Sequence, residues 1–168
     1  MEKSKKVIFI SHCLLNQNAK SKGGAKSPGA IKEIVDILAE SGIGIVQLPC
    51  PQVEYDGGLD RKAKDKVQYD NKKFRADCKK MAGSMLGQIE NYLSKNYTVV
   101  GILGVEFSPT CAVHQLQNGT RAVPGKGILM EELDAEMRKK RFQVPVIGVN
   151  LNNIFSSVEK VQSLISCS

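Results

Sequence analysis

Short apolar runs recur along the chain with the length and composition of buried β-strands. Each is five or six residues long and rich in valine, isoleucine and leucine, which pack well on a pleated sheet. Polar or turn-forming residues bound every run, as expected for strands rather than helices. The sequence predicts four strands, over 7–11, 44–48, 98–103 and 144–149.

Between these runs the apolar residues return every three or four positions, which is the period of an amphipathic helix. Pro28 suits the start of the first such helix, Gly42 suits its end, and Asp70 is the predicted N-cap of the second. The predicted helices cover 29–40, 71–95, 128–141 and 152–165.

The predicted elements alternate strictly between strand and helix. This order favours right-handed crossovers and a parallel sheet. The predicted fold is α/β: a three-layer Rossmann-like or flavodoxin-like parallel sheet of about four strands, with helices on both faces. No internal repeat or linker interrupts the pattern, so residues 1–168 are predicted to form a single domain.

Long irregular segments follow the first three predicted strands. They cover 12–28, 52–69 and 104–127, and a cysteine lies within or just before each of them: Cys13, Cys50 and Cys111. The carboxyl ends of parallel strands meet at one edge of a sheet, where ligands bind. The sequence therefore predicts that these three thiols lie close together.

Thiolates are soft ligands that favour iron–sulfur clusters, zinc or Cu(I). The chain has no closely spaced cysteine pair of the kind found in zinc ribbons or ferredoxins. Three separate loops can still supply three thiolates to a [4Fe-4S] cluster, leaving one iron without a protein ligand. That iron could act as a Lewis acid toward a substrate sulfur atom.

Two histidines and two further cysteines need separate consideration. His12 and His114 flank the cysteine motifs, where they could complete a zinc site, shuttle protons or lie near the site without binding metal. Cys78 falls on the apolar stripe of the long predicted helix, which favours core packing. Cys167 is next to the end of the sequence and is expected to be frayed.

Candidate catalytic groups lie beside the cysteines. Ser108 precedes Cys111 in a Ser-Pro turn, where its hydroxyl could bind substrate or relay a proton. Glu54 and Glu106 are the carboxylates nearest the cysteines, and either could be a general acid or base if burial raises its pKa.

Composition narrows the class of protein further. Hydrophobic residues make up 42% of the chain and charged residues 24%, which is typical of a globular protein. The net charge of +7 allows weak contact with nucleic acid or another anion through a basic surface. No signal peptide or membrane span is indicated, and free thiols suit a reducing compartment, so we expect a cytoplasmic protein with no membrane contact.

The motifs around the cysteines resemble those of a known family. They are Ser-His-Cys-Leu-Leu at 11–15, Pro-Cys-Pro at 49–51, Gly-Gly at 57–58 and Ser-Pro-Thr-Cys at 108–111. In order and spacing they resemble the TudS-type thiouracil desulfidases, formerly a domain of unknown function. The surrounding residues look closer to a TudS-related branch.

The resemblance implies an enzyme with a cluster-dependent activity. Cys13, Cys50 and Cys111 would hold a [4Fe-4S] cluster whose open iron takes the sulfur of a small thiolated substrate, and hydrolysis would release the oxo product. Ser108 would be the assisting serine, and Glu54 or Glu106 the assisting glutamate.

This chain departs from the family pattern at two motifs. Gln52 stands where the family often has glutamate, and Thr110 and Ala112 flank Cys111 where serine and glycine are usual. Because glutamine is neither an acid nor a base at neutral pH, the substrate and the mechanism stay open. The basic composition also allows a second function, a sulfur-trafficking or RNA-binding module without turnover of free bases. Another is a zinc-dependent hydrolase that uses the three cysteines and a histidine.

Overall fold

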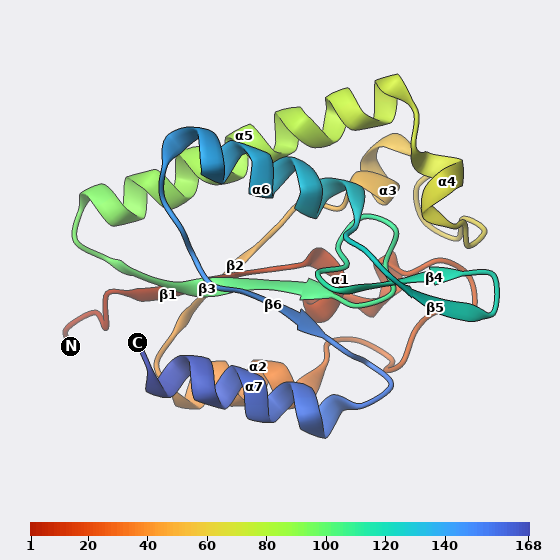
Figure 1. Ribbon diagram of the computed structural model, residues 1–168. Helices are drawn as coiled ribbons and strands as arrows, with labels where there is room; N and C mark the ends of the chain where they lie inside the picture. Colours follow the sequence, from red (N-terminus) through yellow and green to blue (C-terminus); the bar gives the residue numbers. More distant parts are fainter.

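The computed structural model describes residues 1–168 and contains a four-stranded parallel sheet (Figure 1). The strands lie in the order β2-β1-β3-β6. Their bounds are β1 (Lys6–Ile10), β2 (Gly44–Gln47), β3 (Thr98–Val105) and β6 (Val146–Val149). The predicted α/β fold is confirmed, and the order matches the flavodoxin-like class, in which the chain reverses its direction of winding between the first and third strands.

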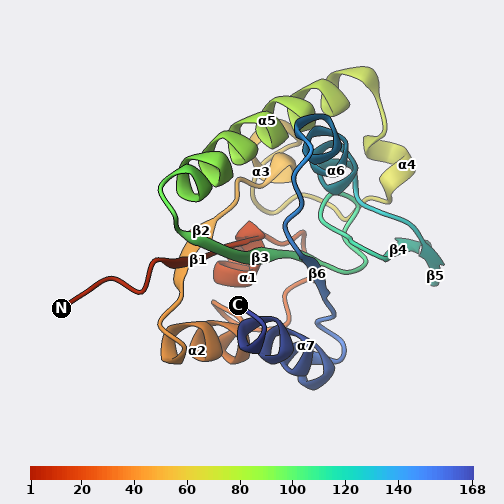
Figure 2. The same cartoon turned by 60° about the vertical axis from the view of Figure 1, so that its left-hand side comes forward.

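Helices cover both faces of the sheet. α5 (Lys72–Ser94) and α6 (Ile128–Lys140) pack together on one face, and α2 (Lys32–Glu40) and α7 (Ile154–Ser166) pack on the other (Figures 1 and 2). Each helix turns an apolar stripe toward the strands, as the sequence period predicts. None of these helices is long and apolar enough to cross a membrane.

The two central strands carry the core. Ile8, Phe9 and Ile10 of β1 are fully buried, and β3 is buried from Val99 onward. They belong to a hydrophobic cluster of 33 buried residues that extends into the helices on both faces. Buried on both sides, these strands form a rigid base for the loops at their carboxyl ends.

The helix ends agree with the sequence at one point and differ at two. α2 begins at Lys32, with Ile31 as its N-cap, and not directly after Pro28. Gly42 follows α2 with a φ of 67°, a left-handed conformation that glycine adopts without steric cost. The N-cap of α5 is Asn71 and not the predicted Asp70, because Asn71 accepts a hydrogen bond of 2.9 Å from the backbone of Phe74. Asp70 instead pairs with Arg75.

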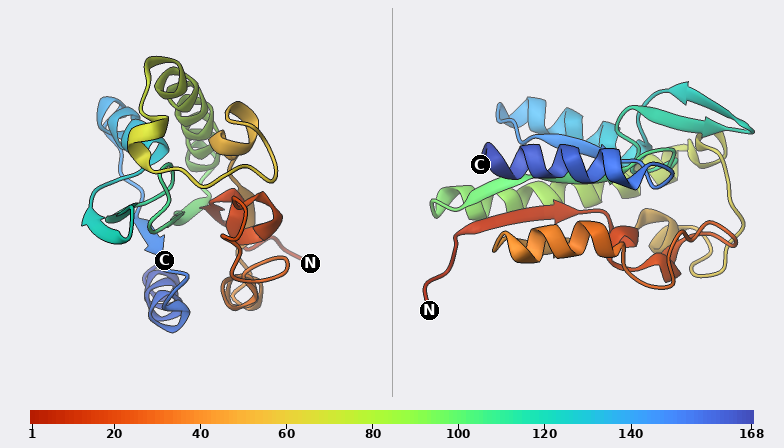
Figure 3. Two further views of the ribbon diagram at one scale, coloured as in Figure 1. Left: turned by 90° about the vertical axis from the view of Figure 1, so that its right-hand side faces the viewer. Right: turned by 90° about the horizontal axis from the view of Figure 1, so that it is seen from below.

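The three segments predicted as irregular loops contain short elements. The first holds α1 (His12–Leu15) and the 3-10 turn η1 (Gln17–Ala19), and the second holds α3 (Pro51–Tyr55) and α4 (Lys66–Tyr69). The third holds a hairpin of β4 (Gln115–Asn118) and β5 (Arg121–Pro124), which projects beyond the carboxyl ends of the sheet strands (Figure 3). Both chain termini lie at the opposite end of the molecule.

Candidate cysteine site

The strand order brings the three predicted cysteines to one place. β2, β1 and β3 are neighbours in the sheet, so the segments after them meet at its carboxyl edge. Cys13, Cys50 and Cys111 all line one cavity of about 320 Å³ at this edge. Cys13 and Cys111 follow the two strands between which the chain changes its winding direction, the usual ligand position in such folds.

Cys13 lies in the first turn of α1, directly after β1. The backbone of Ser11 donates a 2.9 Å hydrogen bond to the carbonyl of Leu103, which ties the end of β1 to β3. Gln17 donates from Nε2 to the carbonyl of Cys13 at 2.7 Å. These bonds hold the short helix, which has too few residues to be stable on its own.

Cys50 is the N-cap residue of α3, directly after β2. Its carbonyl accepts hydrogen bonds from the backbone of Val53 at 3.2 Å and of Glu54 at 3.1 Å. Pro51 occupies the first helical position, where its missing N–H costs nothing and its fixed φ suits a helix. The Pro-Cys-Pro motif therefore starts a helix at the cavity wall.

The backbone around Cys111 is packed so closely that two neighbouring positions, Gly104 and Gly127, have no room for a side chain. A Cβ atom added at Gly104 would lie 2.3 Å from the Cys111 carbonyl oxygen, and one at Gly127 would lie 2.2 Å from the Thr110 carbonyl carbon. The backbone of Ile128, at the start of α6, donates to the Pro109 carbonyl at 3.0 Å. Two glycines and a helix terminus thus fix the position of the Cys111 thiol.

Ser108 lines the same cavity and lies three residues before Cys111. Its Oγ accepts hydrogen bonds from the backbone N–H of Cys111 at 3.0 Å and of Thr110 at 3.3 Å. The preceding residue, Phe107, has a φ of 69°, a left-handed conformation that is strained for an aromatic residue. Such strain, next to a buried polar loop, is typical of functional sites.

Gln52 is a buried member of the site that the sequence marked only as a departure from the family pattern. It lines the cavity, and its Nε2 donates to Thr110 Oγ1 at 3.0 Å. Its Oε1 accepts from Arg61 NH2 at 3.0 Å and from Tyr69 OH at 3.2 Å. The contacts of Arg61 and Tyr69 with Gln52 are not predicted by the sequence, because they depend on how the segment after α3 packs against that helix.

The two candidate glutamates occupy different environments. Glu106 is buried and lines the cavity, and its Oε1 accepts backbone hydrogen bonds from Val113 at 2.8 Å and His114 at 2.9 Å. Glu54 is exposed on α3 and does not line the cavity. The structure therefore brings Glu106, but not Glu54, to the cysteines.

The two histidines and the two other cysteines lie in different parts of the structure. His12 is partly buried and lines the cysteine cavity, whereas His114 lines a different depression beside α7. Cys78 is fully buried in the hydrophobic cluster and Cys167 is exposed, and neither lines the cavity. The thiols of the cavity are thus Cys13, Cys50 and Cys111 alone.

Burial in the cavity favours the neutral thiols of Cys13 and Cys111. Burial raises the pKa of Cys13 to about 12, and the neighbouring Cys111 and Cys50 thiols add to the effect. Burial and the Cys50 thiol also raise the pKa of Cys111. Lys20, which lines the cavity and makes no ion pair, acts in the opposite direction on both thiols.

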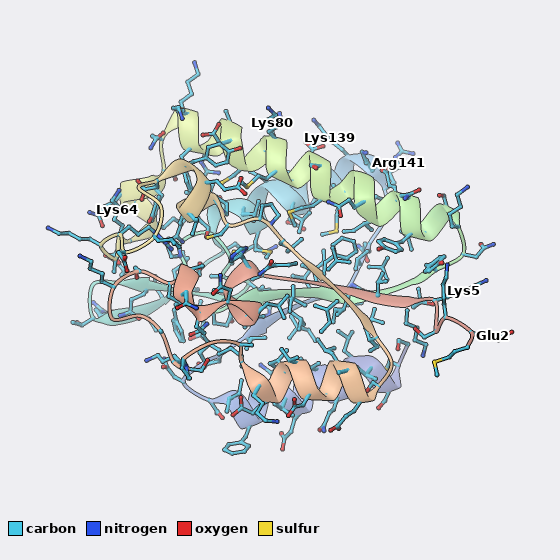
Figure 4. The ribbon with its side chains drawn as sticks, turned by 180° about the vertical axis from the view of Figure 1, so that it is seen from behind. Glu2, Lys5, Lys64, Lys80, Lys139 and Arg141 are labelled. Atoms are coloured by element: carbon cyan, nitrogen blue, oxygen red, sulfur yellow. The ribbon has the colours of Figure 1, made fainter.

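Basic side chains lie both at the cavity and far from it. Lys64 lines the cavity, at the same end of the molecule as the loops, whereas Lys80, Lys139 and Arg141 are spread along the layer of α5 and α6 (Figure 4). Lys64 pairs with Asp56 at 2.7 Å. The nucleic-acid contact inferred from the net charge stays a prediction.

The residues of the cavity fit a group that brings positive charge to several thiols. Ser11 Oγ lines the cavity, is buried and lies beside the Cys111 thiol, whose pKa it lowers, but it makes no well-aligned hydrogen bond, so room for a polar partner is left there. No three His, Cys, Asp or Glu side chains lie close enough together to hold one metal ion. The thiolates of an iron–sulfur cluster bind separate irons, so they do not need the spacing of ligands to a single ion.

The fold is that of a flavodoxin-like α/β protein, in which three cysteines line one cavity at the carboxyl edge of the sheet. No protein-family model matches the chain. The chain belongs to the same family as Uncharacterized protein MJ0003 of Methanocaldococcus jannaschii. The two are 34% identical over an alignment of 164 positions that covers 95% of this chain and 98% of that relative.

A solved structure shares the fold. The [4Fe-4S]-dependent thiouracil desulfidase TudS matches with a TM-score of 0.53 and 20% sequence identity, over 95% of this chain and 99% of that one. This likeness confirms, for the fold, the resemblance to TudS that the cysteine motifs predicted.

Proposed function

We propose that this protein is an iron–sulfur-dependent desulfidase that replaces the sulfur of a small thiolated compound with oxygen. The observation that carries the proposal is the convergence of Cys13, Cys50 and Cys111 on one cavity. The fold shared with TudS, a [4Fe-4S]-dependent thiouracil desulfidase, supports it. In the proposed reaction a C=S group and water give a C=O group and hydrogen sulfide.

Cys13, Cys50 and Cys111 would hold the [4Fe-4S] cluster as thiolates. When bound, the cluster supplies an iron without a protein ligand, which can polarise the C–S bond of a substrate as a Lewis acid. Lys20 lines the cavity without a carboxylate partner, so its charge helps to balance the thiolates. Val105, which is buried, and Pro109, which is partly buried, form an apolar part of the wall of the same space.

Ser108 is suited to donate a hydrogen bond into the cavity. A serine hydroxyl has one hydrogen and two lone pairs, and both lone pairs face the backbone donors of Thr110 and Cys111. Its hydrogen is therefore left for Thr110 Oγ1, 3.3 Å away, or for a substrate atom. We assign Ser108 the role of binding the substrate heteroatom and passing it a proton.

Glu106 is the better of the two candidate glutamates for the acid–base role. It lines the cavity, whereas Glu54 lies outside it. Its Oε1 is held by two backbone N–H groups and its Oε2 makes no hydrogen bond to the protein. In this proposal the carboxylate activates the attacking water through Oε2.

The test is metal analysis of protein reconstituted without oxygen. About four irons and four sulfides per chain are expected, together with sulfide release from 2-thiouracil or another thiolated base. Cys13→Ser, Cys50→Ser and Cys111→Ser should each lose iron and activity. Cys78→Ala and Cys167→Ala are matched controls that should keep both, because these cysteines do not line the cavity.

Two results would contradict the proposed function. Full iron content and activity in any one of the three cavity variants would refute the ligand set. Stoichiometric zinc without iron would instead favour the zinc-dependent hydrolase that the sequence left open.

A further inference from the structure

A chain of hydrogen bonds, part-buried at Arg61 and buried beyond Gln52, leads from Arg61 to the sulfur of Cys111. Arg61 donates to Gln52 Oε1 from Nε at 3.3 Å and from NH2 at 3.0 Å. Gln52 Nε2 donates to Thr110 Oγ1 at 3.0 Å. Thr110 Oγ1 in turn lies 3.6 Å from Cys111 Sγ, with the geometry of a donor to sulfur. The chain thus ends on a proposed cluster ligand.

The chemistry of Arg61 fixes the orientation of the Gln52 amide. A guanidinium group can only donate hydrogen bonds, so the atom of Gln52 that faces Arg61 must be the carbonyl oxygen. Arg61 is itself held by the carbonyls of Ala19 at 2.9 Å and Gly58 at 3.1 Å. The amide nitrogen of Gln52 is therefore left to face Thr110, and it can only donate.

The direction of the Thr110 hydroxyl follows from this. Thr110 Oγ1 accepts from Gln52, so its own hydrogen must go to one of the two remaining neighbours, Ser108 Oγ at 3.3 Å or Cys111 Sγ. Ser108 Oγ already accepts two backbone hydrogen bonds. Because its lone pairs are occupied, the Thr110 hydrogen is directed to Cys111 Sγ.

We propose that Gln52 is a positioning residue that, through Thr110, directs a hydrogen bond to the Cys111 sulfur when that sulfur holds the cluster. This inference rests on the proposed function. A hydrogen bond to a ligand sulfur withdraws negative charge from it, which favours the reduced cluster and helps the protein retain iron. Gln52 itself does not touch the sulfur.

The amide at position 52 matters because a carboxylate would reverse the chain. A glutamate side chain accepts hydrogen bonds with both oxygens. At position 52 it would pair with Arg61 through one oxygen and accept the Thr110 hydrogen with the other. The Cys111 sulfur would then lose the hydrogen bond that Thr110 donates, although every side chain kept its place.

The experiment measures the reduction potential of the cluster and the rate of iron loss to a chelator in the reconstituted protein. Thr110→Val removes the hydroxyl at nearly constant shape, and Thr110→Ser keeps it as the matched control. We expect a more negative potential and about tenfold faster iron loss in Thr110→Val and in Gln52→Glu. Thr110→Ser should match the wild type in both measurements.

The outcomes separate the two proposals. Wild-type protein that assembles no cluster would overturn the proposed function and this inference together. A cluster that assembles normally, with the same potential and iron loss in Thr110→Val as in Thr110→Ser, would overturn only the inference. An unchanged potential in Gln52→Glu would do the same, because it would show that the amide does not set the direction of the hydrogen bond.

Discussion

Glu106 lies directly against Gly148 of the neighbouring strand. A Cβ atom added at Gly148 would lie 2.4 Å from both Cδ and Oε1 of the Glu106 side chain. The same Oε1 accepts hydrogen bonds from the backbone of Val113 and His114. The missing side chain at position 148 therefore leaves the space in which Glu106 ties the Cys111 loop to the sheet.

Gly148→Ala is expected to destabilise the protein by about 1–3 kcal/mol, the usual cost of overpacking a core. The added methyl group would displace the buried carboxylate, since a contact of 2.4 Å is far too short. Urea denaturation measures the change. Gly83→Ala on α5 is the control, because no atom lies within 4 Å of a Cβ there. It should stabilise by about 0.5–1 kcal/mol, and equal effects at the two sites would contradict the packing argument.

Substitutions of Glu106 separate its structural and chemical roles. Glu106→Ala leaves the backbone N–H groups of Val113 and His114 without their acceptor, so we expect a loss of about 1–3 kcal/mol for the buried group. Glu106→Gln keeps an acceptor oxygen and should keep most of the stability. If Glu106 activates water, Glu106→Gln should still lose most of the sulfide release. Full activity in that variant would leave Glu106 with the structural role alone.

The sheet and its four covering helices could be predicted because their patterns are long and local. β1 and β3 are continuous apolar runs, and the helices repeat their apolar positions over several turns. α1 and α3 have only 4 and 5 residues. Helices this short are stabilised by tertiary contacts rather than by their own sequence, so the pattern could not reveal them.

The candidate site could be predicted only where it follows directly from the strands. Cys13 and Cys50 come just after strand ends, so topology alone places them. Gln52 and Glu54 lie two positions apart on α3, and residues so spaced do not share a helix face. Gln52 is buried at the cavity and Glu54 is exposed. Which of the two faces the cavity depends on how α3 packs against the rest of the protein.

Without metal, the stability of the folded protein should fall as the pH rises above about 9. Burial raises the pKa of Cys13 and of Cys78 to about 12, from an ordinary value of 9.0. Below pH 9.0 both states keep the protons, and between 9.0 and about 12 only the unfolded state loses them. The expected slope is up to about 1.4 kcal/mol per pH unit for each such thiol. Urea unfolding across this range measures it.

Cys78→Ala is the control for that pH dependence. Cys78 is fully buried outside the cavity, so its removal should make the slope shallower without changing the iron content of the reconstituted protein. A slope that is the same in the variant and the wild type would show that Cys78 does not titrate differently in the folded and unfolded states.

Lys20 is expected to activate the cavity thiols. It is partly buried, makes no ion pair, and its positive charge lowers the pKa of Cys13 and Cys111 against the effect of burial. In the metal-free protein, Lys20→Met should therefore slow the alkylation of these two cysteines by iodoacetamide, which mass spectrometry measures. In the reconstituted protein, the same variant should lose iron faster. Lys22→Met is the matched control, because Lys22 is exposed and does not line the cavity. Equal alkylation rates in the two variants would show that the charge of Lys20 does not reach the thiols. The balance of charge in the cavity would then have to come from the other basic residues that line it, Lys26, Arg61 and Lys64, or from the bound group itself.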